Sequence, residues 1–300
     1  MKKLLITGAS GFLGWNICLA ARDTWDVFGI YNNNQIEIDK VKTIRLDISE
    51  KTLLEVIFYD IRPDAVIHCA AVSDPNKCQI NPQISYLINV VSAQNIAALC
   101  EKEKIPFVFI STDLVFNGEL PPYKEESIVS PINIYGKHKA EAEKSIQEIY
   151  PQSLICRMPL MFGDVPQNTR SFLQPILKAV LEKKEIKLFT DEYRTPISGK
   201  YAAYGILMAI EKCFGILHLG GRERISRYDF GILVTKILDK DASNIIPVSQ
   251  KDLVMPAPRP KDVSLDSSKA LSLGFKLPSL KEQILELNCV KEIINNYLKK

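Results

Sequence analysis

Residues 4–14 of the chain read LLITGASGFLG, and this stretch decides the fold. The apolar run at its start predicts a buried strand, and Gly8, Gly11 and Gly14 lead from that strand into a helix. Gly8 permits a tight turn, Gly11 lets a ligand approach the backbone, and Gly14 allows close packing of helix on strand. A strand, a glycine turn and a helix start in this order are typical of a dinucleotide-binding site, because free N–H groups and the helix dipole attract a pyrophosphate.

Strand-like apolar runs continue at the same rhythm after this start. The strand-like runs are KLLITGA, DVFGIY, KTIRLD, DAVIHCAA, FVFIST and SLICRMP. Between them we expect helices: one through residues 17–21, one that starts at residue 51, one through residues 89–103, and one that ends at about residue 150. Apolar strands alternating with helices predict a parallel sheet covered on both faces. The fold class is therefore α/β, a doubly wound parallel sheet of the Rossmann type.

The alternation loosens beyond residue 158, where Pro and Gly become more frequent. We expect residues 1–158 to form the dinucleotide-binding domain, rejoined by about 190–220, and residues 159–300 to form mainly a smaller, mixed α/β substrate-binding region. A region of this kind usually builds the wall of a substrate cleft.

The composition excludes several classes of protein. The net charge of +3 is too small to indicate a nucleic-acid partner, and no apolar run reaches the roughly 18 residues of a membrane span. The seven cysteines lack Cys-x-x-Cys spacing, which favours buried thiols in a reducing compartment over a metal site. We expect a cytoplasmic protein without a metal ion.

Tyr135 and Lys139 stand four residues apart in SPINIYGKHK, a spacing that places both side chains on one face of a helix. Ser130 reads as the helix N-cap and Pro131 as its first residue, which puts Tyr135 in the second turn. A nearby ammonium should lower the pKa of the phenol and let it exchange protons near neutrality. Such a pair also occurs by chance, but the turn Ser111-Thr112-Asp113 after a strand and the glycine motif upstream favour a nicotinamide-dependent enzyme.

The end of the second strand bears on which nicotinamide cofactor is bound. Tyr31 and Asn32 stand where an acid would accept from the ribose of NAD, so NADP is predicted and NAD stays an alternative. Asp47 is placed either at the adenine edge or as a helix cap. The predicted cofactor contacts are Gly8, Ser10, Gly11, Phe12, Leu13, Gly14, Tyr31, Asn32, Asp47, Ile48, Cys69, Ala70, Ala71, Tyr135, Lys139 and Met158.

Several segments resemble the extended short-chain dehydrogenase/reductase family, and within it the dTDP-4-dehydrorhamnose reductase group. The similarity spans nearly the whole chain, in TGASGFLG, HCAA, STDLVFNG, PPYKEESIVSPINIYGKHKAEAEK, RMPLMFG, GILHLGG with ISRYDF, and RPKDVSLDSSKALSLGF.

The resemblance implies an NADP-dependent reductase of a 4-keto nucleotide sugar. Thr112, Tyr135 and Lys139 would be the catalytic residues, with Tyr135 giving a proton to the C4 oxygen. Asp113 and Val115 would face the sugar. Arg259 would contact the nucleotide phosphates, and Met158 with Pro159 would lie near the nicotinamide; members of the family are often dimers, so a homodimer is also implied.

The sequence departs from this group at one place. The reductases commonly carry a Trp within the segment written here RMPLMFG, where this chain has Leu160 and Met161. The segment also resembles the regulatory beta subunit of methionine adenosyltransferase, which binds NADP and acts by association. A non-catalytic regulatory subunit is therefore the first alternative, and a nucleotide-sugar epimerase or dehydratase the second.

Overall fold

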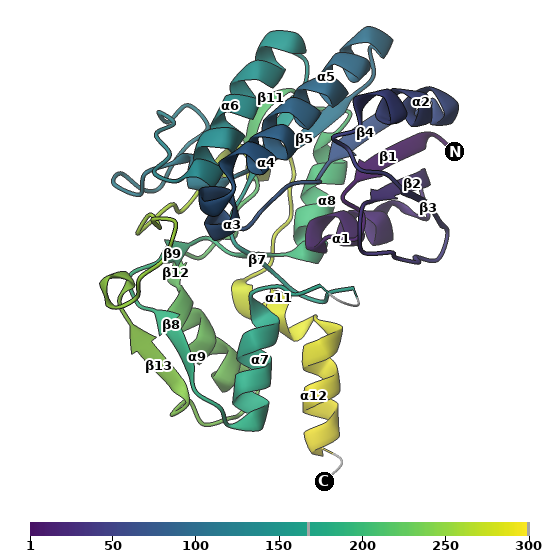
Figure 1. The fold of residues 1–300 in the computed structure, drawn as a ribbon. Coiled ribbons are helices and arrows are strands. Elements are labelled where there is room, and N and C mark those ends of the chain that lie inside the picture. The colour runs from purple at the N-terminus through teal and green to yellow at the C-terminus, as the bar shows by residue number, and fades with distance from the viewer. Residues whose placement is uncertain (167–168, 299–300) are drawn as a thin grey trace.

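The computed structural model of the chain describes residues 1–166 and 169–298. Its centre is a parallel sheet of seven strands in the order β3-β2-β1-β4-β5-β6-β11 (Figure 1). The strands are β1 (Lys3–Thr7), β2 (Asp26–Tyr31), β3 (Val41–Arg45), β4 (Ala65–His68), β5 (Phe107–Thr112), β6 (Leu154–Met158) and β11 (Gly215–His218). Successive strands are added toward one edge of the sheet from β1 to β3 and toward the other edge from β4 onward, so the order switches between β1 and β4. This order confirms the predicted Rossmann-type fold.

Alternate residues of the strands point to opposite faces of the sheet and pack into two separate cores, one on each face. Leu4 and Ile6 pack with the first group of helices, α1 (Phe12–Ala21) and α8 (Gly199–Ala209). Leu5 points the other way, toward the second group, α2 (Lys51–Ile61), α5 (Ser92–Glu103) and α6 (Ile134–Ile149). Figure 1 shows α5 and α6 side by side over one face of the sheet and α8 with α1 over the other. The sheet is thus buried on both faces.

The helix that the sequence predicts through residues 89–103 is one part of a longer helical path. Asp74 caps its first segment, and the path comprises α3 (Pro75–Ile80), α4 (Pro82–Tyr86), a π-helical turn at Leu87–Val91, and α5. Pro82 at the start of α4 cannot donate a helical hydrogen bond, so the helix restarts there.

The predicted start of α6 is wrong by three residues. Ser130 is not the cap, because α6 begins only at Ile134 and the Ser130 N–H donates to the Val115 carbonyl. Asn133 caps the helix instead: its side-chain oxygen accepts from the Gly136 N–H at 2.8 Å. Tyr135 consequently lies in the first turn of α6, not the second.

The elements after β6 build a second core beside the sheet. Phe162, Leu188 and Phe230 lie at its centre. The elements of this part are β7 (Met161–Phe162), α7 (Leu173–Glu182), β8 (Ile186–Phe189), β9 (Tyr193–Arg194), β10 (Ile197–Ser198), β12 (Ile225–Ser226), α9 (Arg227–Ile237), β13 (Ile245–Val248), α10 (Ser268–Ser272), α11 (Leu280–Leu285) and α12 (Asn288–Leu298).

This C-terminal part is not continuous in sequence, since β11 returns to the central sheet beside β6. The boundary at residue 158 between two domains stays a prediction. Among the described helices, none has the length and apolar character needed to cross a bilayer.

Candidate active site

A cavity of about 580 Å³ opens at the carboxyl ends of the parallel strands, where the strand order reverses. Ligands of doubly wound sheets bind at this position. Most of the predicted cofactor residues line the cavity together, from the glycine motif and from the segments after β2, β3, β4 and β6; they are Gly8, Ser10, Gly11, Phe12, Leu13, Gly14, Tyr31, Asn32, Asp47, Ile48, Cys69, Ala70, Ala71 and Met158.

Gly8 makes the turn that opens the cavity at its glycine end. Its φ of +72° belongs to the left-handed region, and a Cβ there would lie 2.7 Å from the Ala70 nitrogen. Any side chain at this position would collide with the backbone after β4. The next helix, α1, begins at Phe12 with its free N–H groups at the cavity, an arrangement that suits a pyrophosphate.

A carboxylate stands beside the end of β2, although it comes from the segment after β3. The Asn32 amide donates to Asp47 at 3.3 Å, and the Ser49 N–H and hydroxyl donate to the same carboxyl group at 3.0 and 2.7 Å. These donors hold the pKa of Asp47 below its usual value, with the Ser49 backbone as the largest cause. Asp47 is thus an ionised acceptor at the edge of the cavity.

The predicted trio Thr112, Tyr135 and Lys139 meets in the same cavity. Thr112 is the last residue of β5, while Tyr135 and Lys139 lie one turn apart on α6. Gly136 allows this approach, because a Cβ there would lie 2.1 Å from the Leu114 carbonyl oxygen. The Lys139 ammonium lies 3.9 Å from the centre of the Phe109 ring.

The electrostatics of the pair differ from those predicted. We expected Lys139 to lower the pKa of Tyr135, but burial raises the pKa of the phenol well above its usual value. The same burial lowers the pKa of Lys139 to about 7. Tyr135 therefore keeps its proton at neutral pH, a state that suits a proton donor.

The residue after Thr112 belongs to the same polar group. The Thr112 hydroxyl donates to Asp113 at 3.1 Å and accepts from the Leu114 N–H at 3.2 Å. Burial raises the pKa of Asp113 to about 6, against the opposing effect of Arg194. The hydroxyl of Thr112 is oriented by these two partners.

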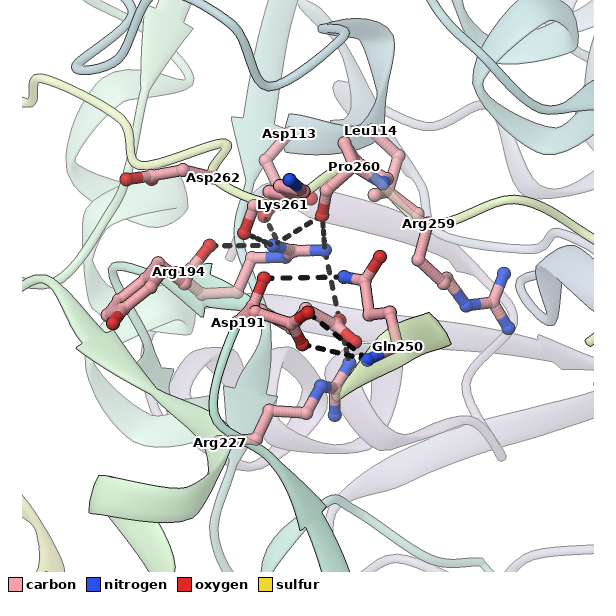
Figure 2. A network of polar contacts seen from close by, with 12 residues as sticks. Asp113, Leu114, Asp191, Arg194, Arg227, Gln250, Arg259, Pro260, Lys261 and Asp262 are labelled. Atoms are coloured by element: carbon pink, nitrogen blue, oxygen red, sulfur yellow. Dashed lines mark hydrogen bonds and ion pairs between the residues drawn. The ribbon is translucent and has the colours of Figure 1, made fainter. Parts of the chain in front are cut away.

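Three charged residues that sequence reasoning missed also line the cavity: Glu192, Arg194 and Arg227. Figure 2 shows the Arg194 guanidinium in the middle of a polar network. Its Nη2 donates to Glu192 at 3.0 Å and to the Pro260 carbonyl at 3.3 Å, and Arg227 pairs with Glu192 at 2.8 Å. Glu192 and Arg194 flank Tyr193 in one segment, whereas Arg227 begins α9, so only the tertiary fold brings Arg227 to the other two.

Arg259, predicted as a phosphate contact, lines the cavity beside this network. Its Nη2 donates to Asn76 at 3.2 Å, whereas the Arg259 Nη1 and the Arg227 Nε are buried donors without a partner among the described residues. Buried donors normally find an acceptor, so both atoms are suited to an anionic ligand.

Two predicted sugar contacts lie in different environments. Asp113 lines the cavity, whereas Val115 does not: its side chain is fully buried in a cluster with Phe116 and Tyr123. Leu160 and Met161, at the position of the family's Trp, are cavity residues.

A Rossmann-type sheet whose glycine turn faces a Thr, Tyr and Lys group across one cavity defines a short-chain dehydrogenase/reductase of the extended type. Within this class the chain belongs to the RmlD substrate binding domain family, whose model matches residues 1–293. The predicted family is confirmed.

Relatives fall into two kinds. The beta subunit of methionine adenosyltransferase 2 from Xenopus laevis is 28% identical over 91% of this chain and 83% of its own length. The probable low-salt glycan biosynthesis reductase Agl14 from Haloferax volcanii is 29% identical over 94% of this chain and 96% of its own. Among solved structures, a hypothetical dTDP-4-dehydrorhamnose reductase from Sulfolobus tokodaii is 34% identical, with a TM-score of 0.80 over 91% of this chain and 94% of that one.

Proposed function

We propose that the protein is an NADP-dependent reductase of a 4-keto nucleotide sugar, with dTDP-4-dehydrorhamnose as the first candidate substrate. The observation that carries the proposal is the convergence of Thr112, Tyr135 and Lys139 on the cavity that the glycine motif lines. The 34% identical relative described as a hypothetical dTDP-4-dehydrorhamnose reductase supports the choice of substrate.

Each residue of the trio has a distinct part in this proposal. When bound, NADPH would supply the hydride for C4 of the sugar. Tyr135, protonated at neutral pH, gives its proton to the oxygen that develops negative charge. Thr112, whose hydroxyl donates to Asp113 in the absence of substrate, rotates that hydroxyl to donate to the oxygen and orient it. Lys139 holds the nicotinamide ribose and supplies positive charge beside the phenol.

The cofactor end of the cavity supports a dinucleotide. The backbone at Gly8 and the N-terminus of α1 form a cradle that a side chain would fill. We favour NADP because Asn32, not an acid, directly follows β2, and because a fold relative from Bacillus anthracis was crystallised with NADP. The ionised Asp47 beside Asn32 keeps NAD as the alternative.

The other end of the cavity supports a substrate that carries phosphate. Arg227 and Arg259 line it, and each has a buried donor for which residues 1–166 and 169–298 offer no partner; Arg259 is the predicted phosphate contact. Arginine suits phosphate because its donors are fixed in a planar fork. Leu160 and Met161 add an apolar wall in place of an indole ring.

The test is a turnover assay with purified protein, NADPH or NADH, and a panel of 4-keto nucleotide sugars that includes dTDP-4-dehydro-L-rhamnose. We expect consumption of NADPH with at least one sugar. Consumption with another sugar alone would change only the substrate, whereas no consumption with any sugar would contradict the proposal.

A regulatory subunit is the second candidate, favoured by the 28% identical methionine adenosyltransferase beta subunit and by the absent Trp. It predicts co-purification with a methionine adenosyltransferase, and an effect on that enzyme that Tyr135→Phe leaves unchanged.

An epimerase or dehydratase ranks third, because such enzymes often need further acids near Thr112 and Asp113 is already paired with Arg194. The homodimer and the cytoplasmic location stay expectations. Light scattering, which measures the molar mass in solution, would test the homodimer.

A further inference from the structure

Glu143 continues the line of side chains that Tyr135 and Lys139 begin on α6. It lies four residues after Lys139, so the three share one face of the helix. Its side chain is nearly excluded from solvent, with 5% exposed. A buried carboxylate is costly unless it is paired, and the proposed reaction gives this one no role.

Arg157 on β6 and Ser111 on β5 hold Glu143 as a carboxylate. The Arg157 Nη2 donates to Oε2 at 2.8 Å and its Nε donates to Oε1 at 3.1 Å, while the Ser111 hydroxyl donates to Oε1. Only 2% of the Arg157 side chain is exposed. This two-point contact fixes both the position and the charge of Glu143.

The remaining donors of Arg157 are used as well. Its Nη1 lies 3.3 Å from the Glu125 carbonyl and 3.3 Å from the His218 Nε2. The His218 Nδ1 faces the Tyr123 carbonyl at 3.2 Å, so it carries the ring proton and Nε2 accepts. Arg157 is thus fixed on every side, and the Glu143 carboxylate cannot turn away from α6 without breaking this network.

Lys139 is in the opposite situation. No carboxylate of the described residues forms an ion pair with it, and its ammonium faces an aromatic ring. Burial lowers the pKa of Lys139 to about 7, and Glu143 is the largest influence in the other direction. The titratable groups that act on it or lie beside it are His68 at the end of β4, Cys69 directly after it, Cys78 on α3, and Tyr135 and Glu143 on α6. Of these, Glu143 is the one carboxylate.

We propose that Glu143 is a positioning residue that keeps the Lys139 side chain charged, with Arg157 and Ser111 holding its carboxylate in place. The part that Lys139 plays toward a cofactor rests on the proposed function, but the charge of Lys139 does not. Glu143 acts through Lys139 and touches no reacting atom. A purely structural pair would tie α6 to β6 without changing how Lys139 titrates.

The experiment follows the titration of Lys139 directly, by NMR of the full-length protein with ¹³C-labelled lysine, assigned with Lys139→Arg. In Glu143→Gln the side chain keeps its shape and loses its charge. We expect the midpoint of Lys139 to fall by about one pH unit, the lower end of what a close opposite charge supplies. Glu143→Asp should retain most of the wild-type midpoint. Glu148→Gln, on the exposed side of the same helix, should leave it unchanged.

Glu143→Gln leaves Arg157 without its partner and risks misfolding, so a double variant, Glu143→Gln with Arg157→Met, removes both charges of the buried pair together. The midpoint should fall here too, but by less than in Glu143→Gln alone, because the Arg157 cation that repels the Lys139 ammonium is removed with the carboxylate. An unchanged or raised midpoint in a folded variant of either kind overturns the proposal. This readout needs neither cofactor nor sugar, so a protein that reduces no sugar but shows the shift contradicts the proposed function alone.

A functional consequence is the pH dependence of NADPH binding, measured by fluorescence titration. Binding should weaken as Lys139 loses its proton, and it should weaken at lower pH in Glu143→Gln than in the wild type. A uniform loss of affinity at every pH would indicate a structural role and contradict the proposal.

Discussion

The Arg194 guanidinium lies 3.5 Å from the Asp113 carboxylate, which pairs a residue of the C-terminal part with the residue that follows Thr112. Both side chains are nearly excluded from solvent, with 3% and 5% exposed. Arg194 also binds Glu192, so one cation serves two buried acids (Figure 2). The network links the strand that carries Thr112 to the segments that would face the substrate.

Arg194→Ala should destabilise the protein strongly. The substitution leaves Asp113 buried without a cation and leaves Glu192 with Arg227 alone, and breaking a buried pair from one side costs about 3–5 kcal/mol. The free energy of unfolding, from urea denaturation, measures the loss. Lys40→Ala, which breaks an exposed pair with Asp23, serves as the control and should change stability by about 0–1 kcal/mol. Equal losses in the two variants would show that Arg194 is not a structural link.

Tyr135→Phe should lower kcat by about 100-fold or more, because it removes the proposed proton donor. Cofactor affinity should change little, since the ring and the Lys139 ammonium stay in place. Tyr86→Phe removes a more exposed hydroxyl, which donates to Glu141, and should leave kcat unchanged. Steady-state kinetics with NADPH and the best sugar decide the matter, and a Tyr135→Phe enzyme as fast as the wild type would refute the assignment.

Asn32→Asp should move the preference from NADP toward NAD. The new carboxylate would stand beside the ionised Asp47, which lies 3.3 Å from the Asn32 amide, and two negative charges there would repel a 2′-phosphate. We expect the ratio of Kd values for NADPH and NADH to rise at least about tenfold. Asn295→Asp, at an exposed position of α12, is the charge-matched control. A ratio that stays constant would place the adenine ribose elsewhere.

The stability of the protein should fall as the pH drops below about 6.5, partly through buried histidines. Burial lowers the pKa of both His68 and His218 to about 3. Their folded pKa lies below the unfolded value, so their stabilising effect is complete above pH 6.5 and is lost toward pH 3. Each should lower the free energy of unfolding by about 1.4 kcal/mol per pH unit in that window.

His218→Gln isolates one of these contributions, because glutamine can still donate to the Tyr123 carbonyl and accept from Arg157 but does not titrate. Urea denaturation at about pH 7, 6 and 5 should give a shallower pH slope for this variant than for the wild type. Parallel slopes would contradict a proton-free His218 in the folded protein.

The local sequence predicted the sheet well, because its strands are continuous apolar runs that no competing pattern disturbs. DVFGIY and FVFIST form strands with the predicted bounds, β2 and β5. The start of α6 was wrong because Asn133 caps the helix while also donating to the distant Pro258 carbonyl, a contact that no local pattern shows. Helix boundaries depend on such tertiary partners.

The site was predictable where a motif spans it and not where the fold assembles it. The glycine motif and the Tyr135–Lys139 spacing each lie within one segment, and both line the cavity. Arg194 and Arg227 lie far from these motifs in sequence. The pKa of Tyr135 was expected to fall because a cation lies nearby, but burial raises it. Spacing identifies neighbours, whereas the degree of burial is a property of the folded chain.

Transfer of deuterium from [4,4-²H₂]NADPH, which is labelled at both hydrogens of C4, tests the central claim most directly. If Tyr135, Thr112 and Lys139 reduce a 4-keto nucleotide sugar, the product should carry one deuterium, at C4, visible by mass spectrometry and NMR, and Tyr135→Phe should slow its appearance by about 100-fold or more. A product without deuterium, or deuterium at another carbon, would contradict the account.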